Sequence, residues 1–429
     1  MTGSPTSARR RRRRPRLGPA LRRAWPLTPR GVGALLTGVA AIVCAHAFGV
    51  VELVYIGVLL IASVAFGWVS LWFVHRYGDV SRSFSPDVTA VGSESIVTVH
   101  ATARGGLSGA VARWTDALPD GIEGDASGIL TGAAALDRLR LTYRIRGTRR
   151  GIREVGPFSI VVTDPFGFTR RSVRAGAAEP ITVAPATVML PPLTEYPGEA
   201  GGSLHTATHQ LGEGADNLIP RAYAPGDSMR RINWRASAHH DELMVRQEEQ
   251  ESTPEATVVL DRAASRWAQS ASRPGEDAAF DAAVTAAVSA VARLAREGYD
   301  VAVIDTEGHP IGAPVPAGDT VAVEQLALEL ATVVTGSDDR LSGLARLFAG
   351  TVAGPVVLIT ARVTAADADA LAPLVAHSAL PVLLAAESSE EALTRASAAG
   401  WRAAVLTPDG DLTDSWRAAT ERGTTRAAL

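Results

Sequence analysis

Two long stretches near the start of the chain consist almost wholly of apolar side chains. Residues 31–50 and 53–74 contain no formally charged residue, and a short turn that holds Glu52 separates them. Each stretch is long enough to cross the apolar core of a bilayer, about 30 Å, as a helix. The pattern therefore predicts a two-helix transmembrane hairpin over residues 31–77, in preference to two buried core helices.

From residue 78 to residue 190, apolar and polar positions alternate with a period of two. Residues 138–146 alternate strictly and place Leu139, Leu141, Tyr143 and Ile145 on one face, which is typical of a half-buried antiparallel strand. Further strands are expected at 95–103, 158–162 and 181–185, and the DPFG sequence at 164–167 suits a type I turn. Short strands separated by Gly and Pro predict a β-sandwich-like domain over residues 78–190.

From residue 256 to residue 429 compact apolar strands alternate with helical segments. Strands are expected at 256–261, 299–305, 354–360, 380–386 and 401–407, and helices at 278–298, 320–335, 364–377 and 388–399. This alternation predicts an α/β domain with a parallel, doubly wound sheet. Ligands of such folds bind at the carboxyl ends of the strands. Asp261 and Asp305, which end two strands, are therefore candidate site residues.

Charge is distributed unevenly along the chain. All 42 basic residues are arginines, and ten of them fall in residues 1–30, a basic tail without an acid. The positive-inside rule places this tail in the cytoplasm, and two crossings return the chain there. Cleavage of a secretory signal near Ala45–Ala47 is an alternative that leaves the body on the same side. We expect a multi-pass plasma-membrane protein whose soluble domains are cytoplasmic.

Nucleic acid is an alternative partner for the six-arginine run of the basic tail. Its position before a membrane span favours topology and contact with anionic lipid. The exposed arginines of the strand at 138–146 are interpreted as a solvated sheet face, because the domain shows no motif of stacking aromatics. We therefore expect the membrane as a partner and no nucleic acid.

Familiar catalytic motifs are missing from the sequence. A Walker motif needs a lysine, and neither GxSxG nor HEXXH occurs. No GxGxxG follows a strand, and the single cysteine excludes an internal disulfide. The cluster at 239–242 is rich in metal-ligand types, but adjacent histidines do not share a face of a helix or strand, so a polar turn is favoured. No catalytic residue and no cofactor is predicted.

Residues 221–238, RAYAPGDSMRRINWRASA, lie in a linker and motif segment, 191–255, between the two soluble domains. Asp227 or Ser228 can cap a helix that starts there, and Met229, Ile232 and Ala236 would give that helix an apolar stripe, with Trp234 as an anchor. Residues 243–251 should form a strand. The arginines either pair with Asp227 and nearby acids to fix the domain junction, or face a partner's carboxylates or phosphate.

The pattern Arg221-x-Tyr223-x-x-Gly226-Asp227-x-x-Arg230-x-Ile232-x-Trp234, followed by Leu243-x-Val245-Arg246, resembles the signature of family 58 of the domains of unknown function. His239 and Gln247 depart from it. The site residues predicted from the motif, with a structural or partner-binding role, are Arg221, Tyr223, Gly226, Asp227, Arg230, Arg231, Ile232, Trp234, Arg235 and Arg246.

The resemblance implies an architecture and partners but no reaction. It implies a C-terminal domain similar to von Willebrand factor type A, association with MoxR-type AAA ATPases, and association with transglutaminase-like membrane proteins. Metal-binding domains of that type carry D-x-S-x-S, where this chain has Asp261 and Ser265 but Ala263 in the middle. Because a hard divalent cation needs several oxygen ligands, Asp261 and Ser265 are weak metal candidates.

We therefore expect a membrane-anchored interaction or scaffold component that works with a AAA ATPase and is not an enzyme. The first alternative is a metal-dependent hydrolase that uses Asp261, Asp305 and the cluster at 239–242. The second is a polyanion binder that uses the arginines of 221–235.

Overall fold

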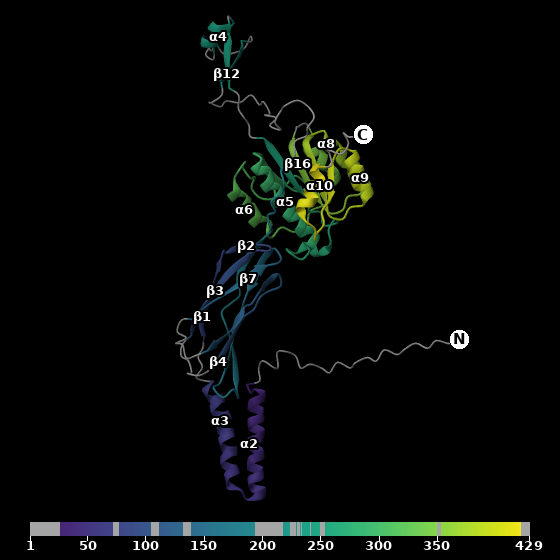
Figure 1. Cartoon of the computed structure of the whole chain (residues 1–429). Coiled ribbons are helices and arrows are strands. Elements are labelled where there is room, and N and C mark those ends of the chain that lie inside the picture. The colour runs from purple at the N-terminus through teal and green to yellow at the C-terminus, as the bar shows by residue number, and fades with distance from the viewer. Residues whose placement is uncertain are drawn as a thin grey trace, which may run out of the picture. The chain divides into compact units, whose positions relative to one another are not determined.

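The computed structural model of the chain describes residues 26–71, 77–103, 111–131, 139–193, 218–223, 229, 232, 234–240, 242–248, 254–349 and 353–421. The chain divides into two compact units (Figure 1). The first takes in the residues up to 88, 94–146 and 153–181, and the second takes in 89–93, 147–152 and 182–429.

The first unit begins with the predicted hairpin. Helices α2 (Pro29–Phe48) and α3 (Val51–Ser70) each have 20 residues, and their mean hydropathies of 1.9 and 2.2 make both long and apolar enough to span a membrane. Gly49, at φ 70°, ends α2 in the left-handed conformation and starts the turn. The backbones touch where Gly38 faces Gly57, since a Cβ on Gly57 would collide with the carbonyl oxygen of Gly38. Small residues at a crossing let membrane helices approach closely.

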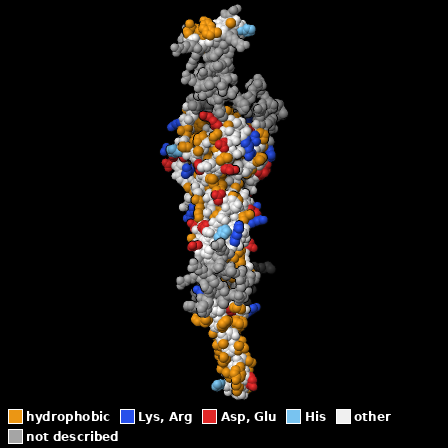
Figure 2. All heavy atoms as spheres, turned by 90° about the vertical axis from the view of Figure 1, so that its left-hand side faces the viewer, with side chains coloured by type: hydrophobic (Ala, Val, Ile, Leu, Met, Phe, Trp, Pro, Cys, Tyr) orange, Lys and Arg blue, Asp and Glu red, His pale blue; other side chains and the backbone are white. Residues whose placement is uncertain are grey.

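Large apolar side chains cover the outside of the hairpin, as Figure 2 shows. Leu36, Leu59 and Phe66 are more than 60% exposed, which suits a lipid environment better than water. A third helix, α5 (Ala278–Arg296), is also apolar enough to span a membrane, but 67% of its apolar window is buried inside the protein. It is a core helix of the second unit.

Sheets make up the rest of the first unit. One has the order β1 (Tyr77–Ser85), β3 (Glu94–Ala103), β7 (Leu139–Gly147), β5 (Ile122–Gly124). Another has the order β10 (Arg170–Ala175), β9 (Phe158–Thr163), β4 (Val111–Asp116), β6 (Ser127–Thr131). A small sheet joins β2 (Val88–Ala90), β11 (Glu179–Ala184) and β8 (Gly151–Val155), and the residues of these strands are divided between the two units. The strands predicted at 95–103, 138–146, 158–162 and 181–185 are confirmed, and so is the buried face of β7.

Aromatic side chains join the two four-stranded sheets. The Trp114 ring of β4 lies 5.7 Å from the Tyr143 ring of β7 and stacks on Phe158. Beside these rings, Arg82 of β1 donates from Nε and Nη2 to the carboxylate of Asp116, both at 2.8 Å. The Tyr143 hydroxyl donates to the same carboxylate at 2.7 Å. A buried ion pair inside a hydrogen-bonded network therefore links the two sheets.

The second unit contains a parallel sheet of five strands in the order β15 (Asp300–Ile304), β14 (Glu255–Leu260), β16 (Ala353–Thr360), β17 (Ser378–Ala385), β18 (Arg402–Val405). Its longer helices are α5, α6 (Thr320–Leu330), α8 (Ala365–Val375), α9 (Glu390–Ala398) and α10 (Leu412–Glu421), and α7 (Leu344–Leu347) is a single turn. All five strands and the helices within 278–298, 320–335, 364–377 and 388–399 agree with the prediction.

Caps and apolar faces explain why these helices form where they do. Asp277 accepts a hydrogen bond from the Phe280 N–H and starts α5, and Thr364 and Asp367 form a reciprocal capping box at α8. Helix α5 packs on β14, β15 and β16. Side chains of α8 and α9 form one buried cluster with Val259 and Leu358 of the sheet. Helices on both faces explain why the strands are almost continuously apolar.

A small segment of the second unit consists of β12 (Leu218–Ala222), α4 (Trp234–His240) and β13 (Met244–Glu248). The two strands pair antiparallel, with Arg221 opposite Val245. The strand predicted at 243–251 is thus confirmed as β13.

Candidate functional site

The sheet of the second unit brings two polar side chains together at its switch point. In this strand order the direction of winding reverses between β14 and β16, and ligands of such folds bind at the carboxyl ends of the strands there. Asp261 directly follows β14 and Thr360 ends β16. The Thr360 hydroxyl donates to the Asp261 Oδ2 at 2.6 Å, and the N–H of Ala263 donates to Oδ1 at 2.9 Å. Asp261 is fully buried.

An arginine fills the centre of this site. Arg266 donates from Nη1 and Nη2 to the two carboxylate oxygens of Asp367, at 3.0 and 2.8 Å, and from Nε to Asp339 at 3.0 Å. Its Nε also lies 3.6 Å from the Oδ2 of Asp261. Its side chain is 9% exposed. One guanidinium thus neutralises part of a cluster of three carboxylates, which we call the Arg266 cluster (Asp261, Arg266, Asp339, Thr360 and Asp367).

The protonation behaviour of the cluster follows from burial and from the arginine. Burial raises the pKa of Asp261, although the hydrogen bonds from Thr360 and Ala263 act in the opposite direction. Burial acts in the same sense on Asp367, but the hydrogen bonds from Arg266 and Thr364 outweigh it and hold the pKa of Asp367 at about 2. The Arg266 pKa is raised because its bonds to Asp367 and Asp339 outweigh the effect of burial, so the arginine stays charged.

This geometry does not fit a divalent cation. Mg²⁺ and Ca²⁺ need several oxygen ligands around one centre, and here the guanidinium occupies the space between the carboxylates. Ala263 supplies no side-chain oxygen, and the hydroxyl of Ser265, an exposed residue, donates to Asp339 at 3.4 Å. Among the described residues no group of three or more His, Cys, Asp and Glu side chains could hold a metal ion.

Asp305, the other candidate carboxylate, shapes a turn. It is 4% exposed, and its Oδ1 accepts hydrogen bonds from the N–H groups of Glu307 and His309, both at 2.9 Å. His309 is 71% exposed at its side chain. The hydrogen bonds of Asp305 thus hold residues 305–309 in place.

The motif segment differs from the expectation in several ways. Its helix, α4, begins at Trp234 and not near Asp227, so Met229 and Ile232 precede it and cannot form a stripe along it. Ile232 is buried and forms a bridge with Val245, but Met229 is 67% exposed. Trp234 is also 67% exposed, so it is not the buried anchor that the sequence suggested.

The other motif residues divide into two groups. Tyr223 is half-buried, and its N–H donates to the Leu243 carbonyl at 2.7 Å. In the β12–β13 pair Arg221 lies opposite Val245 and Arg246 lies opposite Pro220. Arg235 lies in α4. The side chains of these three arginines fall outside the described residues. Gly226, Asp227, Arg230 and Arg231 fall outside them altogether. The choice between an arginine network and exposed arginines therefore stays a prediction.

Comparison with known proteins identifies this part of the chain. Residues 220–346 match the family described as "Protein of unknown function DUF58". The chain carries a DUF58 domain. The match includes residues 220–255 of the motif segment, Asp261 and Arg266, and it ends before β16. Among curated proteins none matches the chain.

Several solved structures are weakly similar to parts of the chain that carries this DUF58 domain. A cohesin module from a family 33 glycoside hydrolase of Clostridium perfringens has 8% identity and a TM-score of 0.19, over 27% of this chain and 99% of that one. A non-cellulosomal cohesin from Archaeoglobus fulgidus has 14% identity and a TM-score of 0.16, over 23% and 91%. A CARDB domain from Pyrococcus furiosus has 14% identity and a TM-score of 0.15, over 24% and 96%. Scores this low carry no argument about fold or function.

One residue outside the DUF58 match is bound tightly to residues inside it. Arg150, in the loop 147–152 of the second unit, is 1% exposed. Its Nε donates to Asp281 at 2.6 Å, and its Nη1 donates to the carbonyl oxygens of Leu330, Ala331 and Val333 at the end of α6. Local sequence could not mark Arg150, because these partners lie 131 to 183 residues further along.

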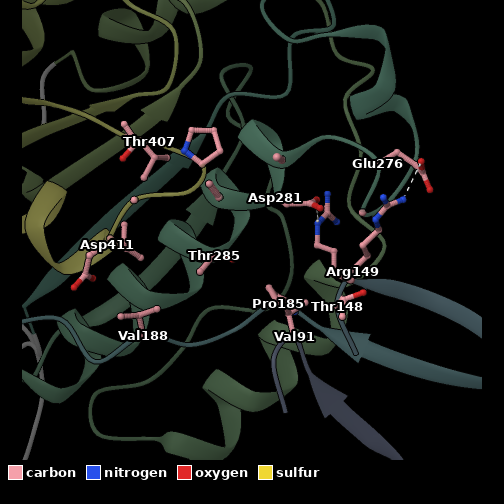
Figure 3. Close-up of a pocket in the computed structure, with 18 residues that line it drawn as sticks. Val91, Thr148, Arg149, Pro185, Val188, Glu276, Asp281, Thr285, Thr407 and Asp411 are labelled. Atoms are coloured by element: carbon pink, nitrogen blue, oxygen red, sulfur yellow. Dashed lines mark hydrogen bonds and ion pairs between the residues drawn. The ribbon is translucent and has the colours of Figure 1, made fainter. Parts of the chain in front are cut away.

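A hollow of about 490 Å³ lies beside Arg150 and is lined mainly by residues of the second unit's helix α5 and of the loop before α10 (Figure 3). Arg149 and Glu276 lie on one side of it, and Thr407 and Asp411 lie on the other. Arg149 pairs with Glu276 at 3.5 Å and Arg150 pairs with Asp281. Because charges of both signs neutralise each other in its walls, the hollow offers no patch of one sign to a charged ligand.

Proposed function

We propose that this chain is a membrane-anchored protein-interaction component that works with a MoxR-type AAA ATPase. In this proposal the hairpin crosses the plasma membrane twice, the sheets of the first unit and the whole second unit lie in the cytoplasm, and a transglutaminase-like membrane protein is a further partner. The resemblance of the motif segment supports the choice of partners. The strand-rich part would be a β-sandwich, and the parallel-sheet unit a von Willebrand A-like domain.

The observation that carries the proposal is a set of exposed apolar side chains within the DUF58 domain. Met229 and Trp234 are each 67% exposed, and Leu243 is 45% exposed. The three lie on one short segment around α4 and the start of β13. Tryptophan is enriched among the residues that dominate protein–protein binding energy, and exposed apolar groups that cluster mark interaction sites.

The Arg266 cluster supports binding over turnover. Its guanidinium fills the position at the switch point where a parallel sheet of this kind would bind a ligand. A buried, always-charged arginine cannot act as an acid or a base near neutral pH. This arrangement favours a domain that recognises another protein.

Capture of the cognate ATPase tests the proposal. Full-length parent and Trp234→Ala would be purified in detergent and mixed with the purified MoxR-type ATPase of the same cell. We expect Trp234→Ala to lower capture strongly with an unchanged melting curve, because the side chain is exposed. The matched control is Val321→Ala, since Val321 is 70% exposed on α6 and lies outside the motif segment of the sequence. Equal capture by parent, Trp234→Ala and a Met229→Ala variant would refute the proposal.

Topology is tested separately. A reporter fused after Leu429 should behave as cytoplasmic, because ten arginines precede the first span and two crossings return the chain. Export of the reporter would refute the proposed orientation.

A further inference from the structure

The DPFG turn of the first unit closes the start of helix α2. The Thr28 hydroxyl, which caps α2 by accepting from the Gly31 N–H, also donates to the carbonyl oxygen of Gly167 at 2.6 Å. The Thr28 N–H donates to the carbonyl oxygen of Phe168 at 2.8 Å, and the Arg170 N–H donates to that of Pro26 at 2.7 Å. The turn is therefore bonded to the entry of the hairpin through backbone groups.

The same turn lies against the end of helix α3. A Cβ on Gly67 would collide with the carboxylate of Asp164, so glycine is required for this close approach. Arg171 donates from Nη1 to the carbonyl oxygen of Leu71, just after the last turn of α3, at 2.9 Å. The rings of Phe66 and Phe166 meet edge to face with centroids 6.4 Å apart. Both helix ends therefore touch one turn.

The turn is rigid because its carboxylate is fully used. Asp164 is 3% exposed, and it accepts hydrogen bonds from the N–H groups of Phe168 and Thr169 and from the Thr169 hydroxyl. Gly167, the fourth residue of the turn, takes the left-handed conformation at φ 75°, which favours glycine. A rigid turn fixes the direction in which Phe166 points.

Phe166 is an exposed aromatic side chain at the level of the helix ends. It is 51% exposed, and its neighbour Phe66 on α3 is 61% exposed. Arg30 and Arg171 are exposed residues of the same region, and Arg30 Nη1 lies 3.8 Å from the position that a Cβ on Gly167 would take. Aromatic rings prefer the boundary between the apolar core and the headgroups of a bilayer, and arginines there attract anionic headgroups.

We propose that residues 164–169 form a membrane-contacting foot of the first unit, with Phe166 inserted at the interface of an anionic phospholipid bilayer. The surface of the hairpin continues into this foot through Phe66, so the same bilayer covers both. The foot holds the sheets of the first unit at a fixed height and orientation above the bilayer. This inference rests on the proposed membrane anchoring of the hairpin.

Spin labels on single cysteines test the foot. Cys44 is the one cysteine of the sequence, so Cys44→Ser provides a background for the full chain in discs of mixed anionic and zwitterionic phospholipid. A label at Phe166→Cys is compared with one at Leu59→Cys, 67% exposed in the middle of α3. The matched aqueous control is Ile96→Cys, 42% exposed and paired with Ser85 at the far end of β1 from α3. Collision with oxygen and with a water-soluble nickel complex is measured for each.

We expect the label at 166 to collide with nickel several-fold less often than the label at 96, and more often than the label at 59. A label at Pro165→Cys should behave like the label at 166. Because this variant keeps the Phe166 ring, it shows whether the result at 166 arises only from the loss of that ring. If the labels at 165 and 166 collide with nickel as often as the label at 96 while the label at 59 is protected, the foot is wrong and the anchor stands. If the label at 59 is also unprotected, the membrane anchoring itself is wrong.

Discussion

Arg82 in the first unit and Arg266 in the second each hold an aspartate in a buried ion pair, yet the two pairs lie in different surroundings. Arg82 and Asp116 are both 0% exposed at their side chains and lie between two sheets. Arg266 and Asp367 are 9% and 12% exposed and lie at the carboxyl edge of one sheet. Both arginines hold an aspartate with two nitrogens, which is the strongest form of such a pair.

The difference lies in the number of carboxylates and in the place within the fold. Asp116 has Tyr143 as a further donor and lies where no ligand could reach it. Arg266 faces three carboxylates, one of which, Asp339, is 39% exposed at its side chain. The pair of Arg82 and Asp116 therefore joins two sheets in the first unit, whereas the pair of Arg266 and Asp367 fills a ligand position at the edge of the sheet in the second unit. Place in the fold, more than the pair itself, decides what a buried ion pair does.

The largest effect should come from the pair between the sheets. Asp116→Ala leaves the Arg82 guanidinium buried without its main partner, which should cost about 3–5 kcal/mol of local stability. Hydrogen exchange of the β3, β4 and β7 amides in the full chain measures this cost. Exchange rates equal to those of the parent would show that water reaches Arg82 and that the pair does not hold the sheets together.

Removal of Arg266 should have a somewhat smaller effect and a different signature. Arg266→Ala leaves three carboxylates facing one another and should cost about 2–4 kcal/mol, less than the first variant because Asp339 remains partly hydrated. Mg²⁺ should stabilise this variant and leave the melting temperature of the parent unchanged, since the guanidinium fills the site of the parent. Arg362→Ala, which removes an exposed pair with Glu387, is the control and should change stability by less than about 0.5 kcal/mol.

A Mg²⁺-dependent stabilisation of the parent that Asp261→Ala abolishes would contradict this account. It would return the metal-dependent hydrolase to consideration.

The pH dependence of the second unit should be tied to Asp367. Its folded pKa of about 2 lies below the ordinary value of 3.8, so its ionised form stabilises the fold above pH 4, and this stabilisation is lost as the pH falls toward 2. Asp367→Asn should therefore cost about 2 kcal/mol at pH 7 and almost nothing at pH 2. Urea unfolding of parent and variant across this range measures the difference. A constant gap at all pH values would mean that the capping of α8, and not the charge, matters.

The smallest effect should come from the hydroxyl between the sheets. Tyr143→Phe removes the hydrogen bond to Asp116 but keeps the ring contact with Trp114 and the pair with Arg82. The expected cost is about 1–2 kcal/mol, again read from exchange of β4 and β7. A loss as large as that of Asp116→Ala would show that Tyr143 and Arg82 act as one inseparable network.

Local sequence patterns were enough to predict the elements that form from the hydrophobic period of neighbouring residues. The hairpin, the alternating strand β7 and all five parallel strands could be predicted, because hydrophobic period and helix caps are properties of short windows. The DPFG turn was also predictable, since Pro165 and Gly167 have positions that the turn type demands. The contact of that turn with the hairpin was not, because the two lie about 100 residues or more apart.

The Arg266 cluster shows where sequence reasoning stops. Comparison with D-x-S-x-S pointed to Asp261 and to the missing hydroxyl at Ala263. The arginine that fills the site stands five residues after Asp261, and its other partners Asp339 and Asp367 lie 73 and 101 residues away from it. The spacing of Arg266, Asp339 and Asp367 along the chain does not reveal that their side chains contact one another in the fold. In the motif segment, the error was to extend α4 back to Asp227, which turned Met229 into a core residue.

The cap of helix α2 has a consequence for biosynthesis. Thr28 finds its carbonyl partners in the DPFG turn about 140 residues later in the chain. At a synthesis rate of about 5–20 residues per second, the start of the hairpin leaves the ribosome on the order of ten seconds before that turn exists. If the hairpin spans the membrane as proposed, it enters the bilayer before Thr28 has its partners in the turn, and the proposed foot forms afterwards. Insertion and docking are then consecutive events, and a chain that stalls before Thr169 would be anchored without the contacts between Thr28 and the turn.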